Sequence, residues 1–354
     1  MSDPVRVFTL LGEAALRQQL QKQWRANGIA LCAMHAEGGE SLIEELGRLR
    51  PQVVVADADV DGARDVVQAA ARRFRIPTLC LVRAATTGPA ALRALEWGAL
   101  NLLTRGSEDM ESFVGELEVA IHEIREAQVV EQLESVFPLS GAFPDASVFD
   151  LRRALRAMEV RDKLIVIGAG LGGPMAMRRI LTTLGGQDCS PIVYVQSFST
   201  GLQEALVPWL ELHTGAQVQR VATGQVLAAG QVYVALLGQD VVRVVRQGTQ
   251  VTLRVTPPNG DARHLDTLLQ SVADVFGPRA VGVLLSGRGD DGSRGLRQLR
   301  DAGALTITQD RASSLHYELP GRARDAGGAI ECLPINEIAE RIHMLMQAEH
   351  AVRS

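Results

Sequence analysis

The sequence predicts an α/β protein with two parallel-sheet domains. Short runs rich in β-branched residues alternate with amphipathic helical segments in both halves of the chain. A polar, proline-containing stretch at 137–146 separates the halves, and 354 residues suit two domains. We expect a five-stranded parallel sheet in the first half. The second half is expected to be a doubly wound sheet with a β-hairpin insertion.

Composition excludes several classes of protein. Apolar residues make up 46% and charged residues 22%, which is typical of a globular chain and excludes a mostly disordered one. The net charge of −5 argues against a nucleic-acid partner. No two of the four cysteines form a CxxC pair, so we expect no metal site and no cofactor. Without a signal sequence or a membrane-length apolar run, a cytoplasmic protein with no membrane insertion is expected.

In the first half, each expected strand is followed by a helical segment. Leu16, Leu20 and Trp24 recur at four-residue spacing, and Gly28 then ends that helix. A capping box formed by Ser41 and Glu44 is expected to open the next one. Further helices are expected at 67–74 and 90–97, and a longer one after Arg105. The expected strands are 5–11, 29–33, 53–56, 78–82 and 100–103.

The second half begins with a short helix at 149–158 and continues with the same alternation. Residues 217–256 instead carry short alternating runs between glycines, which predict antiparallel hairpins. The predicted organisation is a first domain at 1–126, a helical linker at 127–160 and a second domain at 161–350. Expected strands are 163–167, 191–196, 280–285 and 305–308, and expected helices are 201–213, 264–276, 292–302, 319–326 and 335–348.

The loop GAGLGG at 168–173 follows a strand and opens a helix. It matches the G-x-G-x-x-G pattern of dinucleotide-binding loops. That chemistry needs an acid at the end of the next strand to bind the ribose, but this strand ends Val195-Gln196-Ser197. A tight strand-to-helix turn that needs glycine is therefore favoured over a nucleotide site.

Two acidic motifs follow strands. Asp57-Ala-Asp59-Val-Asp61-Gly62 imitates a calcium loop, but its twelfth position is Gln68 and a strand precedes it, so calcium is discounted. The segment 286–292, SGRGDDG, places Asp290 and Asp291 after a buried strand, where α/β proteins carry chemistry. The structural alternative is a cap on the helix that follows, which the residue spacing alone favours.

Together these segments resemble the CheB family of chemotaxis protein-glutamate methylesterases. The resemblance covers nearly the whole chain, from a receiver-like domain through a linker to a methylesterase-like domain. It implies a flavodoxin-like first domain and hydrolysis of glutamyl methyl esters on chemoreceptors. The segments that carry it are VIGAGLGGPMAMRRIL (166–181), IVYVQSF (192–198), VGVLLSGRGDDGSRGLRQLRDAGALTITQD (281–310) and YELPGRARDAGG (317–328).

The catalytic positions depart from the family pattern. Where the family has its nucleophilic serine, this chain has Gly170, and Ser197 replaces the histidine that acts as base. Asp291 matches the third triad residue, and Arg288 stands where the family has methionine. A Ser–His–Asp site needs an oxygen nucleophile and a base, so these exchanges predict loss of catalysis. The other residues expected to line the cleft are Gly168, Leu171, Gly172, Gln196 and Asp290.

A relocated nucleophile is the enzymatic alternative. Ser197, Ser199 and Ser286 are the candidate nucleophiles, with His264 or His316 as base. Each candidate also has a non-catalytic interpretation. In that interpretation Ser197 fills space, Ser286 is a small hydroxyl residue of the kind the family has at that position, and both histidines lie on the surface.

The receiver-like half also departs from its pattern. Asp57 matches the phosphoacceptor, but Leu11 and Gly12 replace the acidic pair that binds magnesium, and Arg105 replaces a lysine. Phosphoryl transfer needs that neutralising charge, so we expect Asp57 not to be phosphorylated.

The leading hypothesis is a catalytically inactive CheB-like protein that acts as a binding or regulatory module in chemotaxis or pilus-based motility. Its expected partners are chemoreceptor cytoplasmic tails, a histidine kinase or other chemosensory proteins. The alternatives are an active methylesterase or deamidase with a relocated nucleophile, and a nucleotide-binding module that uses the GAGLGG loop.

Overall fold

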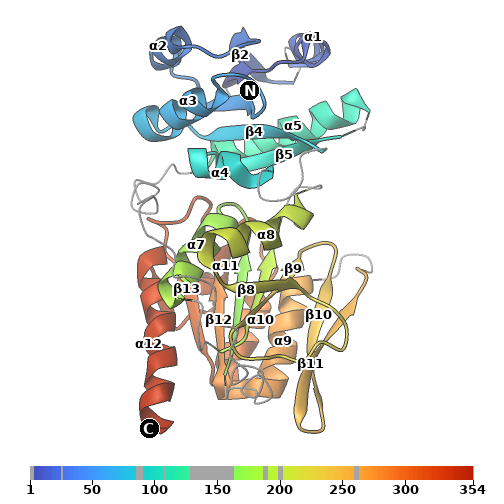
Figure 1. Ribbon diagram of the computed structural model, residues 1–354, viewed down its shortest axis with the longest axis vertical. Helices are drawn as coiled ribbons and strands as arrows, with labels where there is room; N and C mark the ends of the chain where they lie inside the picture. Colours follow the sequence, from blue (N-terminus) through green and yellow to red (C-terminus); the bar gives the residue numbers. More distant parts are fainter. Residues whose placement is uncertain are drawn as a thin grey trace. The chain divides into compact units, whose positions relative to one another are not determined.

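The computed structural model describes residues 4–24, 27–84, 91–106, 109–127, 163–185, 190–197, 202–258 and 263–353. They form two compact units, one built on a five-stranded sheet and the other on a seven-stranded sheet (Figure 1). The linker predicted at 127–160, with its helix at 149–158, lies outside the described residues apart from Ala127. In the described part of the chain, no helix has the length and apolar content needed to cross a bilayer.

The first unit confirms the predicted five-stranded sheet. All neighbouring strands pair in parallel in the order β2-β1-β3-β4-β5, which is the flavodoxin-like order. β3 is buried along its whole length except at its last residue, Asp57, as the apolar run predicts. The strands are β1 (Val5–Leu10), β2 (Ile29–His35), β3 (Val53–Asp57), β4 (Thr78–Arg83) and β5 (Asn101–Arg105).

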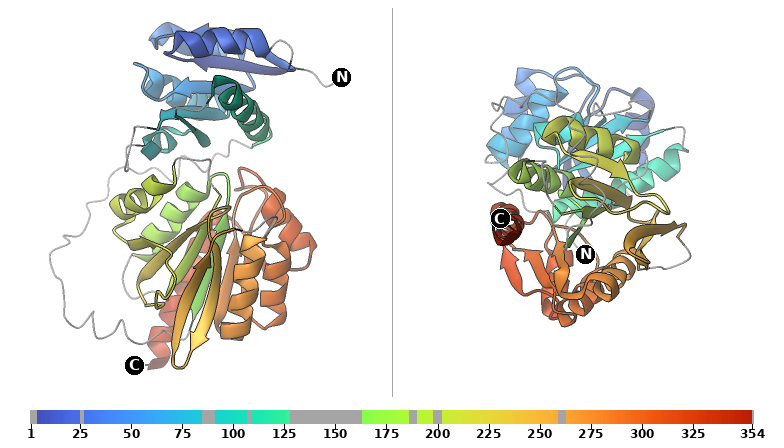
Figure 2. Two further views of the ribbon diagram at one scale, coloured as in Figure 1. Left: turned by 90° about the vertical axis from the view of Figure 1, so that its right-hand side faces the viewer. Right: turned by 60° about the horizontal axis from the view of Figure 1, so that its bottom comes forward.

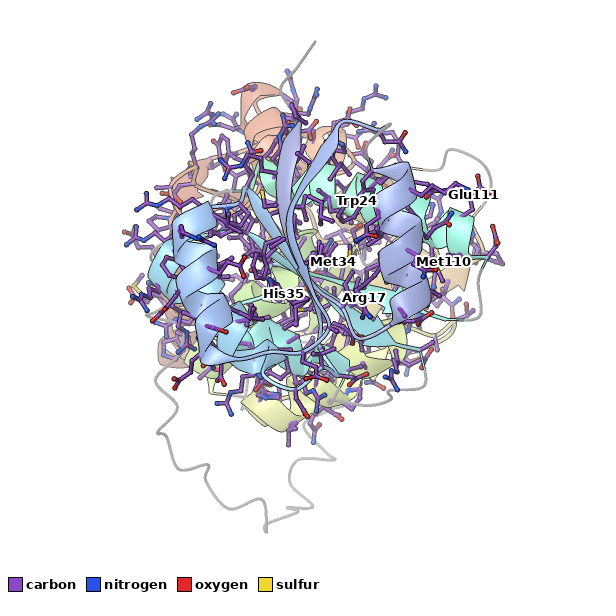
Figure 3. The ribbon with its side chains drawn as sticks, turned by 90° about the horizontal axis from the view of Figure 1, so that it is seen from above. Arg17, Trp24, Met34, His35, Met110 and Glu111 are labelled. Atoms are coloured by element: carbon purple, nitrogen blue, oxygen red, sulfur yellow. The ribbon has the colours of Figure 1, made fainter. Side chains whose placement is uncertain are left out.

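Helices cover both faces of this sheet. Figure 3 shows α1 and α2 on opposite sides, and α1 packs with α5 while α2 packs with α3. Trp24, directly after α1, is 1% exposed and anchors that end of the helix. The helices are α1 (Ala14–Gln23), α2 (Glu40–Leu49), α3 (Ala63–Gln68) with the π-helical continuation η1 (Ala69–Phe74), α4 (Arg93–Trp97) and α5 (Met110–Arg125).

The predicted capping box at Ser41 and Glu44 is wrong. Helix α2 already begins at Glu40, with Gly39 as its N-cap residue and no side chain in the capping position. The amide of Gly38 instead donates to the Asp61 carbonyl at 2.8 Å, and this contact between two loops fixes where the helix starts. A long-range backbone contact thus overrides the local capping signal.

Two helices of the first unit end on arginines in the left-handed conformation. Arg50 ends α2 with φ 44° and Arg75 ends η1 with φ 56°. They are the only non-glycine residues with positive φ among the described residues. Glycine is the usual residue at this position, and a residue with a Cβ costs about 1–2 kcal/mol there.

The second unit contains a fully parallel sheet in the order β14-β13-β12-β6-β7-β9-β8. Its central strand, β6, comes first in the sequence, with β7 on one side and β12 on the other. The chain therefore reverses its direction of travel across the sheet between β6 and β12, where α/β proteins place ligands. The strands are β6 (Leu164–Ala169), β7 (Ile192–Gln196), β8 (Gln217–Arg220), β9 (Gln231–Leu236), β12 (Ala280–Leu284), β13 (Leu305–Gln309) and β14 (Glu331–Leu333).

This sheet is covered by two helical layers (Figure 2). Right-handed crossovers that run in opposite directions from β6 put their helices on opposite faces. Accordingly α7 packs with α12, while α9 packs with α10 and α10 with α11. The helices are α7 (Gly173–Leu184), α8 (Gln203–Thr214), α9 (His264–Phe276) with the 3₁₀ turn η4 (Gly277–Arg279), α10 (Ser293–Asp301), α11 (Glu318–Asp325) and α12 (Ile335–Arg353).

The hairpin prediction for residues 217–256 is only partly right. Strands β10 (Val241–Gln247) and β11 (Gln250–Thr256) form an antiparallel hairpin that packs on α9. Strands β8 and β9 instead pair in parallel and join the main sheet. From its second residue β9 is buried throughout, which is typical of a parallel strand rather than a half-exposed hairpin strand.

Two glycines in helices of the first unit provide a matched stability test. A Cβ at Gly115 of α5 would meet nothing within 4 Å, whereas one at Gly47 of α2 would lie 2.9 Å from the Phe74 ring. Gly115→Ala should therefore raise the free energy of unfolding by about 0.5–1 kcal/mol, as expected at an open helical site. Gly47→Ala should lower it, because Phe74 must move. Urea unfolding of both variants checks this, and equal gains would contradict the packing around Phe74.

Candidate functional site

The loops that follow β6 and β12 meet at the reversal point of the second sheet. The amide of Gly170 donates to the Ser286 carbonyl at 2.9 Å. A Cβ at Gly170 would lie 3.0 Å from the Cα of Gly287, so the two loops touch backbone to backbone. The two motifs predicted to carry chemistry are thus brought together at one sheet edge.

The positions predicted to correspond to the family nucleophile and base are adjacent, and they carry glycine and serine. Gly170 is buried, and Ser197 is exposed beside it, with its amide bonded to the Ala169 carbonyl at 2.9 Å. The Gln196 side chain is buried between them and donates from Nε2 to the Gly170 carbonyl at 2.9 Å. Neither position therefore carries an imidazole, and position 170 carries no hydroxyl, whereas acyl transfer requires a nucleophilic oxygen and a base.

The glycines of the GAGLGG loop are explained by contacts within the protein. A Cβ at Gly168 would lie 2.4 Å from Leu265 Cδ2, and one at Gly173 would lie 2.0 Å from Gln196 Oε1. Gly172 has φ 80° and caps α7. All three glycines of the G-x-G-x-x-G pattern, including Gly170, thus face atoms of this chain. These contacts favour the turn interpretation over a phosphate-binding loop.

Asp291 belongs to a reciprocal pair of helix caps. Its two carboxylate oxygens accept the amides of Leu265 and Asp266, at 3.1 and 3.0 Å, in the first turn of α9. In return, Asp266 Oδ1 accepts the amides of Gly292 and Gly295 at the start of α10, at 2.9 and 2.7 Å. The helices' own N-cap residues, Arg263 and Gly292, supply no capping side chain. The start of each helix is therefore capped by a carboxylate from the segment that begins the other helix.

Charged side chains form an alternating chain around this loop. Arg263 bonds Asp266 and also Asp290, the latter at 3.0 Å. The hydrogen bond from Arg263 lowers the pKa of Asp290 below its usual value. Burial alone would raise the pKa of Glu318, but hydrogen bonds from the Gly289 amide and Arg322 outweigh burial and lower it. Arg288 Nε lies 4.0 Å from Glu318, so the position that is methionine in the family carries a paired cation here.

The side chains of the candidates for a relocated site make other contacts. Ser286 is 3% exposed, and its hydroxyl accepts the His316 amide at 2.9 Å. His264 is 6% exposed and accepts the Gly238 amide on Nδ1, so its expected surface position is wrong. His316 is half-buried and Ser199 lies outside the described residues. Among the described candidates, no serine hydroxyl is bonded to a histidine side chain.

In the first unit, Asp57 lies at the carboxyl end of β3 beside Gly12. A Cβ at Gly12 would be 3.8 Å from Asp57 Oδ2, while Oδ1 accepts the Asp59 amide at 3.1 Å. Leu11 is 1% exposed, and Arg17 (Figure 3) donates to the carbonyls of Leu11 and Gly12. Within the described part of the chain, no cluster of three or more metal-binding side chains surrounds Asp57 or occurs elsewhere. The residues present do not fit the magnesium site of a receiver.

The fold and the paired loops define a class: a two-unit α/β protein with a receiver-like sheet and a doubly wound sheet whose site loops meet at β6 and β12. The family model described as CheB methylesterase matches residues 165–342. The chain belongs to that family.

Relatives extend the match beyond the second unit. A protein-glutamate methylesterase/protein-glutamine glutaminase of Geobacter metallireducens is 32% identical over 96% of this chain and 99% of its own. Protein-glutamate methylesterase FrzG of Myxococcus xanthus is 31% identical over 81% of this chain and 83% of its own. The crystal structure of the Thermotoga maritima CheB methylesterase catalytic domain superposes with a TM-score of 0.50 at 26% identity. It covers 52% of this chain and all of that domain.

Sequence reasoning missed the partners of Asp291. Asp266 carries the reciprocal cap, and Arg263 links it to Asp290. The signal available in the sequence was an acid in the first turn of a strongly predicted helix. It does not show which distant helix that acid caps.

Removing the Asp291 carboxylate should destabilise the second unit. Asp291→Ala leaves two amides of α9 without their acceptor and should lower the free energy of unfolding by about 1–2 kcal/mol. Asp290→Ala removes a neighbouring carboxylate that is 52% exposed and should cost less than about 0.5 kcal/mol. Urea unfolding distinguishes the two variants, and equal losses would mean that Asp291 is not a structural cap.

Proposed function

We propose that this chain is a cytoplasmic CheB-family signalling protein that binds chemosensory partners without hydrolysing methyl esters. One observation carries the proposal: at the meeting point of the β6 and β12 loops, the nucleophile position is Gly170, which has no side chain. With no oxygen at that position, no acyl-enzyme forms there.

The remaining triad positions support the same conclusion. The base position is Ser197, whose hydroxyl does not accept a proton near neutral pH, and Asp291 has both oxygens bonded to amides of α9. The backbone framework around them is complete, with the two loops joined by the Gly170–Ser286 hydrogen bond. Replacement of the nucleophile and the base on an intact framework favours retention of the protein for binding.

The two alternatives find less support. A relocated nucleophile needs a hydroxyl hydrogen-bonded to a base, but the Ser286 hydroxyl is held by the backbone of His316. A nucleotide at the GAGLGG loop needs free space at the start of α7, but Gln196 fills it. The active methylesterase remains the alternative that the names of the relatives favour, and activity measurement decides between it and binding alone.

The partner that this proposal favours is a chemoreceptor cytoplasmic helix bearing glutamate side chains. Arg288 and Arg322 flank Glu318 beside the β12 loop, and both are exposed. Arginine side chains at the rim of a binding surface attract and orient carboxylates. A histidine kinase or another chemosensory protein is the other expected kind of partner.

The native protein should release no methanol from methylated receptor membranes. The informative variant carries Gly170→Ser and Ser197→His, which restores a hydroxyl and an imidazole on one framework. A serine Cβ at 170 requires Gly287 to move by only a few tenths of an ångström. Even so, we expect at most weak turnover in this variant, because Asp291 stays bound to α9.

Clear methanol release by the native protein would overturn the proposal. Ser197→Ala and Ser286→Ala would then locate the nucleophile. A control for the double variant is its thermal unfolding, which must match that of the parent before its turnover is interpreted.

The binding function itself is tested with a receptor cytoplasmic fragment. We expect measurable association with the full chain, weakened several-fold by Arg288→Ala because an exposed rim cation is lost. The matched control is Arg297→Ala on α10, which removes an arginine that is 62% exposed and pairs with Asp301 instead. Equal effects of the two variants, or no association with receptor, kinase or other chemosensory proteins, would contradict the proposal.

A further inference from the structure

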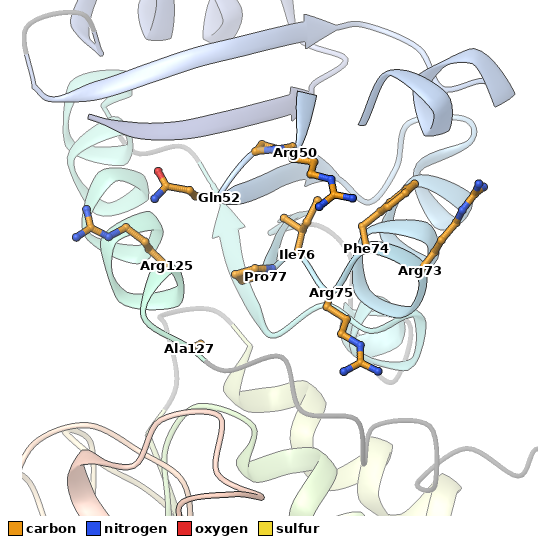
Figure 4. Close-up of a pocket in the computed structure, with 10 residues that line it drawn as sticks. Arg50, Gln52, Arg73, Phe74, Arg75, Ile76, Pro77, Arg125 and Ala127 are labelled. Atoms are coloured by element: carbon orange, nitrogen blue, oxygen red, sulfur yellow. The ribbon is translucent and has the colours of Figure 1, made fainter. Parts of the chain in front are cut away.

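A cavity of about 430 Å³ opens in the first unit at the edge where strands β3 and β4 begin (Figure 4). It lies at the opposite end of β3 from Asp57, so it is separate from the phosphoacceptor position. Residues from the ends of three helices line it: Arg50 after α2, Phe74 and Arg75 at the end of η1, and Arg125 at the end of α5. Its volume is within the range of small-molecule sites.

The charge of this cavity has one sign. Arg50, Arg73, Arg75 and Arg125 are four of its ten lining residues, and none of the ten is an aspartate or glutamate. Guanidinium groups stay charged at all physiological pH values and bind phosphate oxygens in pairs of hydrogen bonds. The chain as a whole is acidic, with a net charge of −5, so this concentration of cations is local.

The backbone is strained at two of these arginines. Arg50 and Arg75 are the two described non-glycine residues with positive φ, and both line this cavity. Glycine at either position would relieve the strain, yet the chain carries arginine at both. Strain of this kind concentrates at ligand-binding sites, where the side chain that causes it is needed.

The cavity also contains an aromatic surface. The half-buried Phe74 ring lines it, and the guanidinium of Arg73 lies 5.1 Å from the centre of that ring. Ile76 and Pro51 are buried residues of the same lining. Flat aromatic and guanidinium surfaces stack on heteroaromatic bases. The aromatic part of the lining therefore favours a nucleotide over an acidic peptide as the ligand.

We propose that this cavity binds a nucleotide, with Arg50 and Arg75 on its phosphates and Phe74 against its base. The site differs from the GAGLGG loop, whose glycines face protein atoms, and it does not depend on catalysis in the second unit. Through this cavity the first unit responds to a bound ligand, without phosphorylation of Asp57.

Isothermal titration of the full chain with ADP and GDP, and separately with inorganic pyrophosphate, tests the site. Arg50→Gly and Arg75→Gly should each weaken nucleotide binding about tenfold or more. Both variants should be at least as stable as the parent, because glycine prefers the left-handed conformation. Loss of binding therefore cannot be ascribed to unfolding.

Two further variants complete the test. Phe74→Leu should weaken ADP or GDP binding but leave pyrophosphate binding unchanged. Arg48→Ala, which removes an arginine of α2 that is 76% exposed and does not line the cavity, should change neither.

Four results would overturn the proposal. The first is absence of ADP and GDP binding at about 1 mM. The second is pyrophosphate binding as tight as nucleotide binding, which would mean a simple anion site. The third is an equal loss in Arg48→Ala and Arg50→Gly, which would mean non-specific attraction by positive charge. Tighter binding of an acidic peptide than of either nucleotide would assign the cavity to a protein partner instead.

Discussion

The exchange of carboxylate caps between α9 and α10 is the constraint on which the second unit's site depends. Asp291 satisfies the start of α9 and Asp266 satisfies the start of α10, so neither helix can shift without breaking the other's cap. The loop between β12 and α10 is thereby fixed at its far end. At its near end, Ser286 bonds the Gly170 amide, and the two anchors together set the backbone of the site.

This arrangement holds the β6 and β12 loops in place through contacts that are not catalytic. The contacts that shape the site are made by backbone groups, glycines and the caps, none of which needs a nucleophile or a base. Gln196 and Gln309 bond buried backbone groups of the two loops, with Gln309 accepting the Ser286 amide at 2.8 Å. The amide and carbonyl of Gly170 both keep hydrogen-bond partners although that position carries no side chain.

Regular periodicity made most helices and strands predictable. The features that were missed depend on pairing between segments that are distant in the sequence. Helix α9 was predicted at its observed bounds because its apolar stripe is uninterrupted. The parallel pairing of β8 with β9 was missed, because alternation does not reveal a strand's partner, and β14 is too short to give a pattern. In the site, the GAGLGG loop and Asp291 were found from local motifs, and their correspondence to catalytic positions came from the resemblance. Their roles depend on Leu265, Gln196 and Asp266, which are distant in sequence. The arginine cavity has no sequence signal, because Arg50, Arg75 and Arg125 come from three separate helix ends.

The strand order of the second sheet has a consequence for synthesis of the chain. β6 leaves the ribosome first, but its partner β12 follows more than a hundred residues later, as the pairing of Leu164 with Ala280 shows. Until then, one edge of this fully buried strand has unpaired amides and carbonyls, which is the condition under which nascent sheets associate with other chains. Native pairing at this edge also closes a long loop, which slows folding. The contact between the β6 and β12 loops is therefore completed late, and β6 keeps an open edge until β12 has been made.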